Sequence, residues 1–200
     1  MIPRGAWRDV GDGRRLRRPA GGLEPAEDLP DDLAAGVELD GADLGETRRA
    51  PLTLVDSVLR RCNLSAAVWQ QVTVRQTELL DARALGLRLS VDLAQDLYVS
   101  GCRFRDAVVR VQRVRGLAVF AGCDFTDAVI SGDLSAMVFT DCTFTGAEFA
   151  ATDADGCDLR GSRLAGSRGL LTLRGARVTT DQTVAVAARL ATEAGLSVEE

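Results

Sequence analysis

Apolar residues recur every five positions along most of this chain. Between Cys123 and Leu164 the third position of each block of five holds Phe, Leu, Ile or Ala, and the residue two positions earlier is usually small. We call the third position the centre of a block. A period of five fits neither an α-helix, with about 3.6 residues per turn, nor a strand, in which side chains alternate. The pattern therefore predicts a structural repeat.

The repeat covers most of the sequence. It begins near Val37, weakens over residues 45–51 and reaches its last centre at Val178. All six Phe residues lie at centres, and all five Cys residues lie two positions before a centre. Both positions are therefore predicted to face the interior.

Three single-residue slips interrupt this period. One residue is inserted before Phe120, one is lost between Ile130 and Leu134, and one is lost between Leu164 and Leu173. We expect such slips at the corners of the fold, where an irregular residue disturbs the pairing least.

Several blocks resemble those of the pentapeptide-repeat family, whose consensus is close to A-(D/N)-L-x-x. The matching blocks include Ala42-Asp43-Leu44, Cys62-Asn63-Leu64, Cys123-Asp124-Phe125 and Cys157-Asp158-Leu159. The resemblance implies an all-β solenoid, a right-handed four-sided parallel β-helix with one block per face and, here, about seven coils. In that geometry centres four blocks apart lie in one column, so the Phe residues are predicted to stack on adjacent coils.

The chain divides into three predicted segments. Residues 1–33 are rich in Gly, Pro and charge without any period, which predicts a flexible N-terminal tail. Within it, the arginine run of residues 14–18 is interpreted as solvated, with an electrostatic contact as the alternative. Residues 34–178 form the predicted β-helix. Residues 179–200 form a C-terminal capping helix and tail.

The capping helix is predicted from its start signal. Thr179-Thr180-Asp181-Gln182 fits a capping box with Thr179 as the N-cap. Small apolar residues then follow at helical spacing and predict its packed side: Val184, Ala187, Ala188, Ala191 and Ala194. The family resemblance implies that such a helix closes the β-helix, and that the protein is a monomer or a dimer through a β-helix end.

The composition removes the usual catalytic groups. The chain has no His, and all 24 basic residues are Arg. It therefore lacks the commonest general base and metal ligand, and it has neither His nor Lys to activate a nucleophile. We expect a protein that is not an enzyme and that binds no cofactor and no metal.

Four cysteines fall in one column of the predicted β-helix: Cys62, Cys102, Cys123 and Cys142. Adjacent Cα atoms would lie about 4.8 Å apart, a spacing that would tolerate a disulfide or a soft-metal site. The position also requires a small buried residue, and free Cys behaves as one. We interpret the column as structural.

Charge and apolar content also limit the partners and the location. The net charge of −5 argues against direct nucleic-acid binding. No apolar run is long enough to cross a bilayer, so no membrane contact is expected. Five Cys residues without an apolar leader suggest reduced thiols and a cytoplasmic protein.

Charge is distributed unevenly along the repeat. Residues 57–115 hold ten Arg against five acids, whereas residues 116–159 hold eight acids and no basic residue. These eight acids form a candidate protein-binding surface that we call the acidic band: Asp124, Asp127, Asp133, Asp141, Glu148, Asp153, Asp155 and Asp158.

Two functions are compatible with this pattern. The first is a non-enzymatic scaffold that binds a protein partner through its flat faces. The second follows from the resemblance, because some pentapeptide-repeat proteins imitate DNA, bind a type II topoisomerase such as DNA gyrase and protect it from quinolone-type poisons. An acidic band suits such a mimic, although the arginines of the first half argue against imitation along the whole length.

A second candidate surface is apolar. Tyr98, Val119 and Val138 take the position just before the centre on one predicted face and should point outward together. They are a candidate face for binding another protein or a second copy. The alternative is that they are ordinary strand residues, since aromatic and β-branched side chains favour strands.

Overall fold

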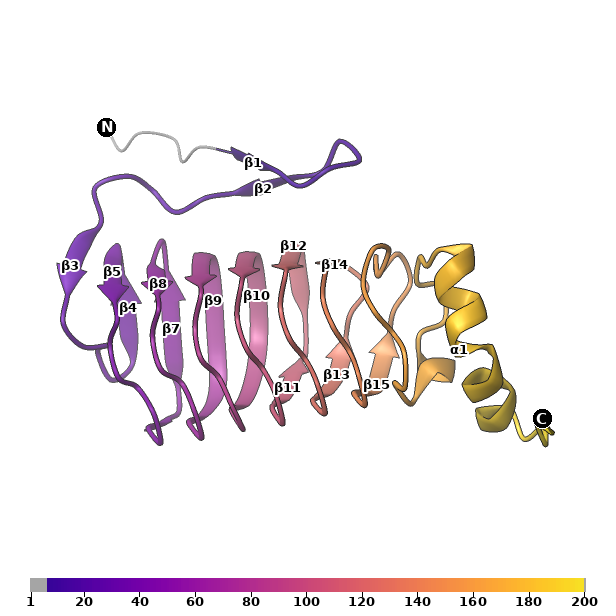
Figure 1. Ribbon diagram of the computed structural model, residues 1–200. Helices are drawn as coiled ribbons and strands as arrows, with labels where there is room; N and C mark the ends of the chain where they lie inside the picture. The colour runs from indigo at the N-terminus through magenta and orange to yellow at the C-terminus, as the bar shows by residue number, and fades with distance from the viewer. Residues whose placement is uncertain (1–6, 200) are drawn as a thin grey trace.

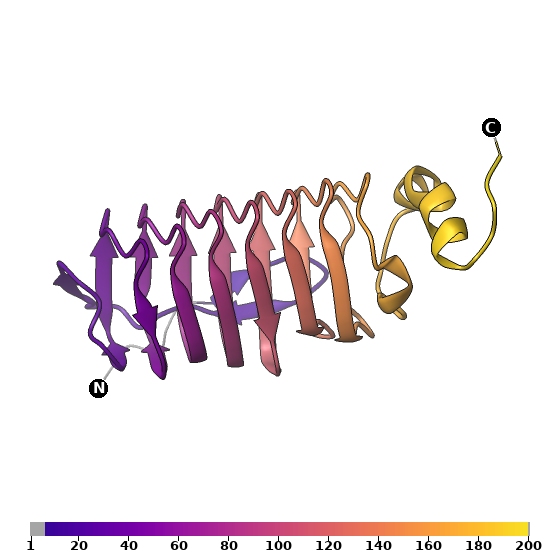
Figure 2. The same ribbon diagram turned by 90° about the horizontal axis from the view of Figure 1, so that it is seen from below.

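The structure is a computed structural model that describes residues 7–199. It is an elongated stack of parallel coils that is closed at one end by a helix. An N-terminal hairpin lies along one side of the stack (Figures 1 and 2). The strands are β1 (Trp7–Asp9), β2 (Arg15–Arg17), β3 (Glu24–Ala26), β4 (Leu33–Ala35), β5 (Val37–Asp40), β6 (Arg48–Arg49), β7 (Leu52–Val55), β8 (Val58–Arg60), β9 (Val68–Leu80), β10 (Arg88–Ser100), β11 (Val108–Val111), β12 (Val114–Ala121), β13 (Val129–Asp133), β14 (Met137–Thr140) and β15 (Glu148–Asp153). A 3-10 turn η1 (Leu170–Thr172) and helix α1 (Thr180–Glu193) follow.

Pairing between coils makes the solenoid four-sided. Four parallel ladders run along it, and near the N-terminal end they pass through the pairs Glu38–Val58, Asp43–Asn63, Arg48–Val68 and Thr53–Thr73. Neighbouring ladders lie five residues apart, so each side takes one block of the sequence repeat. The predicted parallel solenoid is confirmed, and six turns separate Asp43 from Arg163.

The interior is built from the two predicted inward positions. All five cysteines and all six phenylalanines are buried. Phe104, Phe125 and Phe144 stack face to face on successive coils, with ring centroids 4.9 and 5.2 Å apart. Phe120 and Phe139 form a second stack at 5.1 Å, edge-on to the first. The predicted aromatic stacking is therefore confirmed.

The three slips lie at corners, as expected. The inserted residue shifts the pairing of β10 with β12 next to Asp96, whose φ is positive. The first lost residue shifts the pairing of β13 with β15 after Gly132, which has a φ of 97°. The second lost residue coincides with the tight η1 turn.

Helix α1 closes the C-terminal end through polar contacts. The capping box is confirmed, because Gln182 N donates to Thr179 Oγ1 and Thr179 N donates to Gln182 Oε1. Gln182 Nε2 also donates to the carbonyls of Leu159 and Ser162, at 2.6 Å each, which ties the helix to the last coil.

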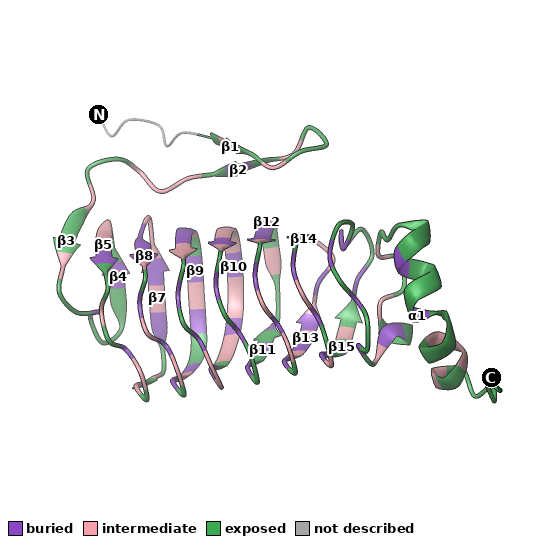
Figure 3. Ribbon diagram, viewed as in Figure 1, coloured by how far each residue is buried: buried purple, intermediate pink, exposed green. Residues whose placement is uncertain are grey.

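The predicted packed side of this helix is wrong. Val184 is 72% exposed, whereas Gln182 and Val186 are the buried residues of the helix. Most of α1 is coloured as exposed in Figure 3. The reason is that the helix lies across the end of the solenoid, and its orientation there is set by the contacts of Gln182 and by Glu193, which accepts from the N–H of Gly169 at 2.7 Å.

The N-terminal segment differs from the flexible tail expected over residues 1–33. Residues 1–6 of that tail lie outside the described residues, as does residue 200. Strand β3 pairs with β5, and β4 pairs with β7, so residues 24–35 belong to the solenoid. These residues show no five-residue period, so the sequence pattern did not indicate the pairing. They form a first, partial coil that has a neighbouring coil on one side only.

Candidate functional site

Residues 7–18 form a β-hairpin, which we call the N-terminal hairpin. Strands β1 and β2 pair antiparallel from Trp7–Arg17 to Asp9–Arg15. The turn between them contains Asp12 and Gly13, with φ values of 52° and 72°. Two successive positive φ values are typical of the tight hairpin turns that Asp-Gly favours. This Asp-Gly dipeptide is the sequence signal for the hairpin, although residues 1–33 were expected to form a flexible tail.

The N-terminal hairpin lies along one side of the solenoid (Figures 1 and 2). We call this side the covered face and define it by its outward residues: Val58, Glu78, Tyr98, Val119, Val138 and Asp158. Leu16 is fully buried against Val119 and Val138, in an apolar cluster separate from the main core. The predicted apolar face therefore exists as one ladder, but its expected exposure is wrong, because the hairpin covers it.

One anchor of the hairpin is a carboxylate in the middle of the covered face. Glu78 points outward yet has no exposed side-chain surface. Its Oε1 accepts from Arg8 Nη2 at 3.0 Å and from Arg18 Nε at 2.9 Å. Arg8 also lies 3.7 Å from the ring centroid of Tyr98, which adds a cation–π contact.

The other anchor is at the hairpin tip. Arg14 Nη2 donates to Asp158 Oδ2 at 2.6 Å, and Arg160 contacts both Asp158 and Asp12. The hydrogen bond from Arg160, joined by that from Arg14, holds the pKa of Asp158 well below its usual range. Asp158 thus stays ionised at neutral pH and binds the tip as an anion.

Arg14 and Arg18 are therefore not simply solvated, which corrects the interpretation of the arginine run. Their partners lie 144 and 60 residues away in the sequence, so no local pattern could reveal the contacts. Glu78 was not identified as a binding residue for the same reason, because its arginine partners are distant in the sequence. Arg15 and Arg17 point to the exposed side of the hairpin.

Some buried polar atoms at the hairpin contacts lack a hydrogen-bond partner among the described residues. Glu78 Oε2, Arg8 Nε and Arg14 Nε are buried and make no hydrogen bond within residues 7–199. A buried polar atom without a partner costs about 1–3 kcal/mol. The covered face thus holds the hairpin through two charged anchors and Leu16, and the unpaired buried atoms reduce the net stabilisation.

The acidic band is not gathered on one face. Asp124, Glu148, Asp133 and Asp158 belong to four different ladders, and Asp153 pairs with Asp133. Asp127 and Asp141 lie at corners with positive φ, and Asp155 lies in a turn. Arginines contact three of its members: Arg105 approaches Asp124 at 3.9 Å, Arg168 approaches Glu148 at 3.6 Å, and Asp158 is paired as described. The acids thus encircle the solenoid.

The cysteine column behaves as interior packing. The thiols of Cys102, Cys123 and Cys142 donate to backbone carbonyls of their own or the preceding coil. Hydrogen bonding with Cys102 and burial raise the pKa of Cys123 to about 12, and burial raises that of Cys157 to about 12. These two thiols stay protonated at neutral pH, which disfavours metal binding and nucleophilic attack.

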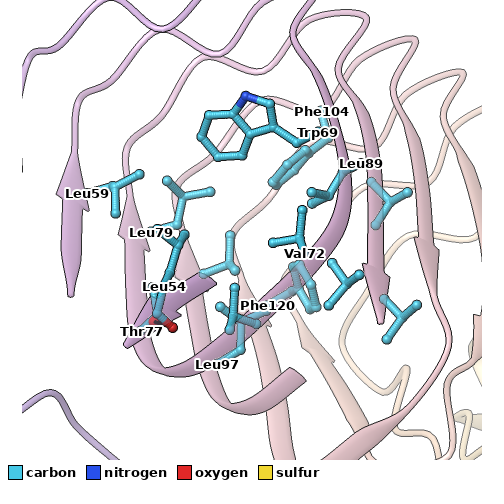
Figure 4. A pocket seen from close by; sticks show the side chains of 15 residues that line it. Leu54, Leu59, Trp69, Val72, Thr77, Leu79, Leu89, Leu97, Phe104 and Phe120 are labelled. Atoms are coloured by element: carbon cyan, nitrogen blue, oxygen red, sulfur yellow. Dashed lines mark hydrogen bonds between the residues drawn. The ribbon is translucent and has the colours of Figure 1, made fainter. Parts of the chain in front are cut away.

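One cavity lies inside the solenoid, with a volume of about 60 Å³ (Figure 4). Its lining is apolar apart from Thr77, whose hydroxyl donates to the carbonyls of Leu54 and Arg75. The cavity thus offers no charged group for catalysis. Within residues 7–199, no cluster of His, Cys, Asp or Glu could hold a metal ion. None of the described helices has the length and apolarity needed to cross a membrane.

A shallow groove lies on an uncovered face formed by β9, β10 and β11. Val108, 41% exposed, pairs with Arg88 on β10 and lies two residues before Arg110 on β11, and Gln70 and Ser90 also line the groove. Neither arginine has an ion-pair partner within the described part of the chain. The groove thus offers an apolar contact flanked by two positive charges.

Comparisons with known proteins agree with the repeat. Residues 133–168 match the sequence model of the family described as Pentapeptide repeats, in eight copies. The resemblance drawn from the sequence is confirmed, and the chain carries pentapeptide repeats. No curated protein matches it.

Solved structures of similar proteins include QnrB1, described as a plasmid-mediated fluoroquinolone resistance protein. A trypsin-treated variant of QnrB1 is 20% identical with a TM-score of 0.43, and the match covers 85% of this chain and 84% of that one. Full-length QnrB1 is 18% identical with a TM-score of 0.41, covering 81% and 84%. HetL from the cyanobacterium Nostoc sp. strain PCC 7120, a pentapeptide-repeat protein involved in heterocyst differentiation regulation, is 16% identical with a TM-score of 0.19, covering 75% and 86%.

Proposed function

Because this chain carries pentapeptide repeats and one of its four faces is occupied by a polypeptide segment, we propose that it is a non-enzymatic scaffold that binds proteins through its outer faces. The observation that carries this proposal is the N-terminal hairpin itself. The covered face holds it through an apolar ladder and two anchoring carboxylates, Glu78 and Asp158. A flat solenoid face of this composition is therefore suited to recognising polypeptide.

The uncovered faces are available for a partner. The groove around Val108 combines an exposed apolar residue with Arg88 and Arg110, which make no ion pair within residues 7–199, and this resembles the apolar centre and polar rim of protein interfaces. Its charge suits a partner with an acidic surface.

Site-specific photo-crosslinking tests the scaffold function. A photoreactive phenylalanine analogue at Val108 should crosslink a discrete protein in extract from the native cells, and excess unmodified protein should abolish the product. The same analogue at Val184, exposed on the remote helix α1, is the matched control and should give no such product. Absence of any competable crosslink at Val108 and at equivalent positions of the other open faces would contradict the proposal.

Imitation of DNA at a type II topoisomerase is the alternative function. It is favoured by one part of the acidic band, where Asp124 lies on a ladder bordered by the corner residues Asp127 and Asp141. The nearby Arg103 and Arg163 on the same ladder weaken the negative potential of this face. A mimic would therefore use a short anionic surface rather than the whole solenoid.

A supercoiling assay with DNA gyrase, with and without a quinolone, tests this alternative. If the alternative holds, micromolar protein changes supercoiling or its inhibition by the drug, and replacing Asp124, Asp127, Asp133 and Asp141 together by Asn abolishes the effect. Asn is chosen because it tolerates the positive φ of the corner positions and can still accept the turn hydrogen bonds. The matched control replaces Asp40, Asp43, Asp56 and Asp81 by Asn. No effect of the wild-type protein would eliminate the alternative.

A further inference from the structure

The N-terminal hairpin is not part of the solenoid's sheet. Strands β1 and β2 form a two-stranded sheet of their own, whereas the other strands belong to one sheet of 13. An isolated two-stranded hairpin is marginally stable in water. Its order therefore depends on the covered face, while the coils beneath do not depend on it for backbone pairing.

A hinge joins the hairpin to the solenoid. Strand β3 is paired with β5 and marks the start of the fixed part. The connection before it contains Pro19, Gly21 and Gly22, and Gly22 has a φ of 81°. Glycine pairs give a connection rotational freedom. The hairpin can thus leave the face without disturbing the coils.

Opposing contributions determine the free energy of hairpin detachment. Removing the hairpin exposes the apolar ladder around Val119 and Val138, which opposes detachment. It also returns Glu78 and Asp158 to water and relieves the unpaired Oε2 of Glu78. Because rehydration of the buried carboxylates offsets part of the loss from the ion pairs, the docked hairpin is held less strongly than its contacts alone suggest.

We propose that the covered face is a recognition site for extended, arginine-bearing polypeptide segments, and that the N-terminal hairpin is its displaceable resident ligand. The partner segment carries an apolar residue flanked by arginines, as in Arg14-Arg15-Leu16-Arg17-Arg18. This inference rests on the proposed scaffold function and adds the class of partner and the control of access. The tether gives the hairpin an effective concentration of about millimolar, so it blocks weak competitors and admits tight ones.

A binding experiment with the full chain tests the proposal. The probe is a fluorescein-labelled peptide with the sequence of residues 7–20, followed by fluorescence anisotropy. In the variant Leu16→Asp, a buried charge against Val119 and Val138 should release the hairpin. The triple variant R8A/R14A/R18A releases it instead by removing the three hairpin arginines that bind Glu78 and Asp158. Arg15→Ala is the matched control, because this side chain is exposed and makes no ion pair within residues 7–199.

The peptide should bind both released variants at least about tenfold more tightly than the wild type or Arg15→Ala, because no tethered competitor remains. Adding Glu78→Gln to Leu16→Asp should weaken this binding at least about tenfold, since a neutral amide loses the charge-assisted bonds to two arginines. A peptide carrying Asp in place of Leu should not bind. Hydrogen exchange confirms that residues 7–18 are released and that the coils stay protected.

Two results would overturn the proposal. One is failure of the peptide to bind released variants whose coils remain protected. The other is protection of residues 7–18 that persists in both released variants, which would make the hairpin a permanent part of the fold. Neither result affects crosslinking at Val108, so failure here is distinguishable from failure of the scaffold function.

Discussion

Phe125→Ala should lower the free energy of unfolding by about 3–5 kcal/mol, the cost of removing a large aromatic side chain from a close-packed core. Phe125 is 1% exposed and lies between Phe104 and Phe144 in the aromatic stack. It also contacts Phe120 and Phe139 edge-on, with centroids 5.7 and 6.0 Å away. Four aromatic neighbours on three coils lose their contact with one substitution, and the rigid coils cannot collapse to fill the space.

Urea denaturation followed by circular dichroism measures this effect. Because each coil contacts only its neighbours, weakening one coil in the middle also uncouples the two halves. The transition of Phe125→Ala should therefore become broader as well as earlier. Phe125→Leu is the matched control, since it keeps most of the volume and should lose much less. A loss below about 1.5 kcal/mol for the alanine variant would show that the stack is not a main source of stability.

The interior of this protein could be predicted from the sequence because its physical cause is local and repeated. Phe125 lies at a centre, and Cys123 lies two positions before it. The same spacing between an apolar centre and a small residue recurs along the coils, and both positions point inward. The four-sided geometry implied by the family resemblance then placed Phe104, Phe125 and Phe144 in one column, where they do stack.

The covered face could be predicted only in part. Tyr98, Val119 and Val138 were placed on one ladder because the repeat also defines the outward direction. What covers them could not be predicted, since the contact of Leu16 joins parts of the chain about one hundred residues apart and follows no period. The charge of Arg14 is equally compatible with solvent and with Asp158, and only the three-dimensional path of the hairpin selects the carboxylate.

A second large loss of stability is expected from substitution of Gly132, which lies where one residue of the repeat is lost after Ile130. A block of four residues must complete a corner that normally takes five, and the chain does so by bringing Gly132 against the preceding coil. A Cβ atom added there would lie 1.9 Å from the carbonyl oxygen of Val111, and the φ of 97° is unfavourable for any residue with a side chain. Since this neighbour is backbone of a paired strand, it cannot move aside without breaking the ladder between β11 and β13.

Gly132→Ala should therefore lose about 3 kcal/mol or more of unfolding free energy, through backbone strain and a steric clash together. Gly122→Ala is the matched control: its φ of 61° is also positive, but nothing lies within 4 Å of an added Cβ. It should lose only the cost of the left-handed conformation, about 1–2 kcal/mol. The difference between the two midpoints in urea thus isolates the close approach. If the two variants were equally destabilised, the short corner would be an ordinary left-handed turn, and the slip would not require glycine in particular.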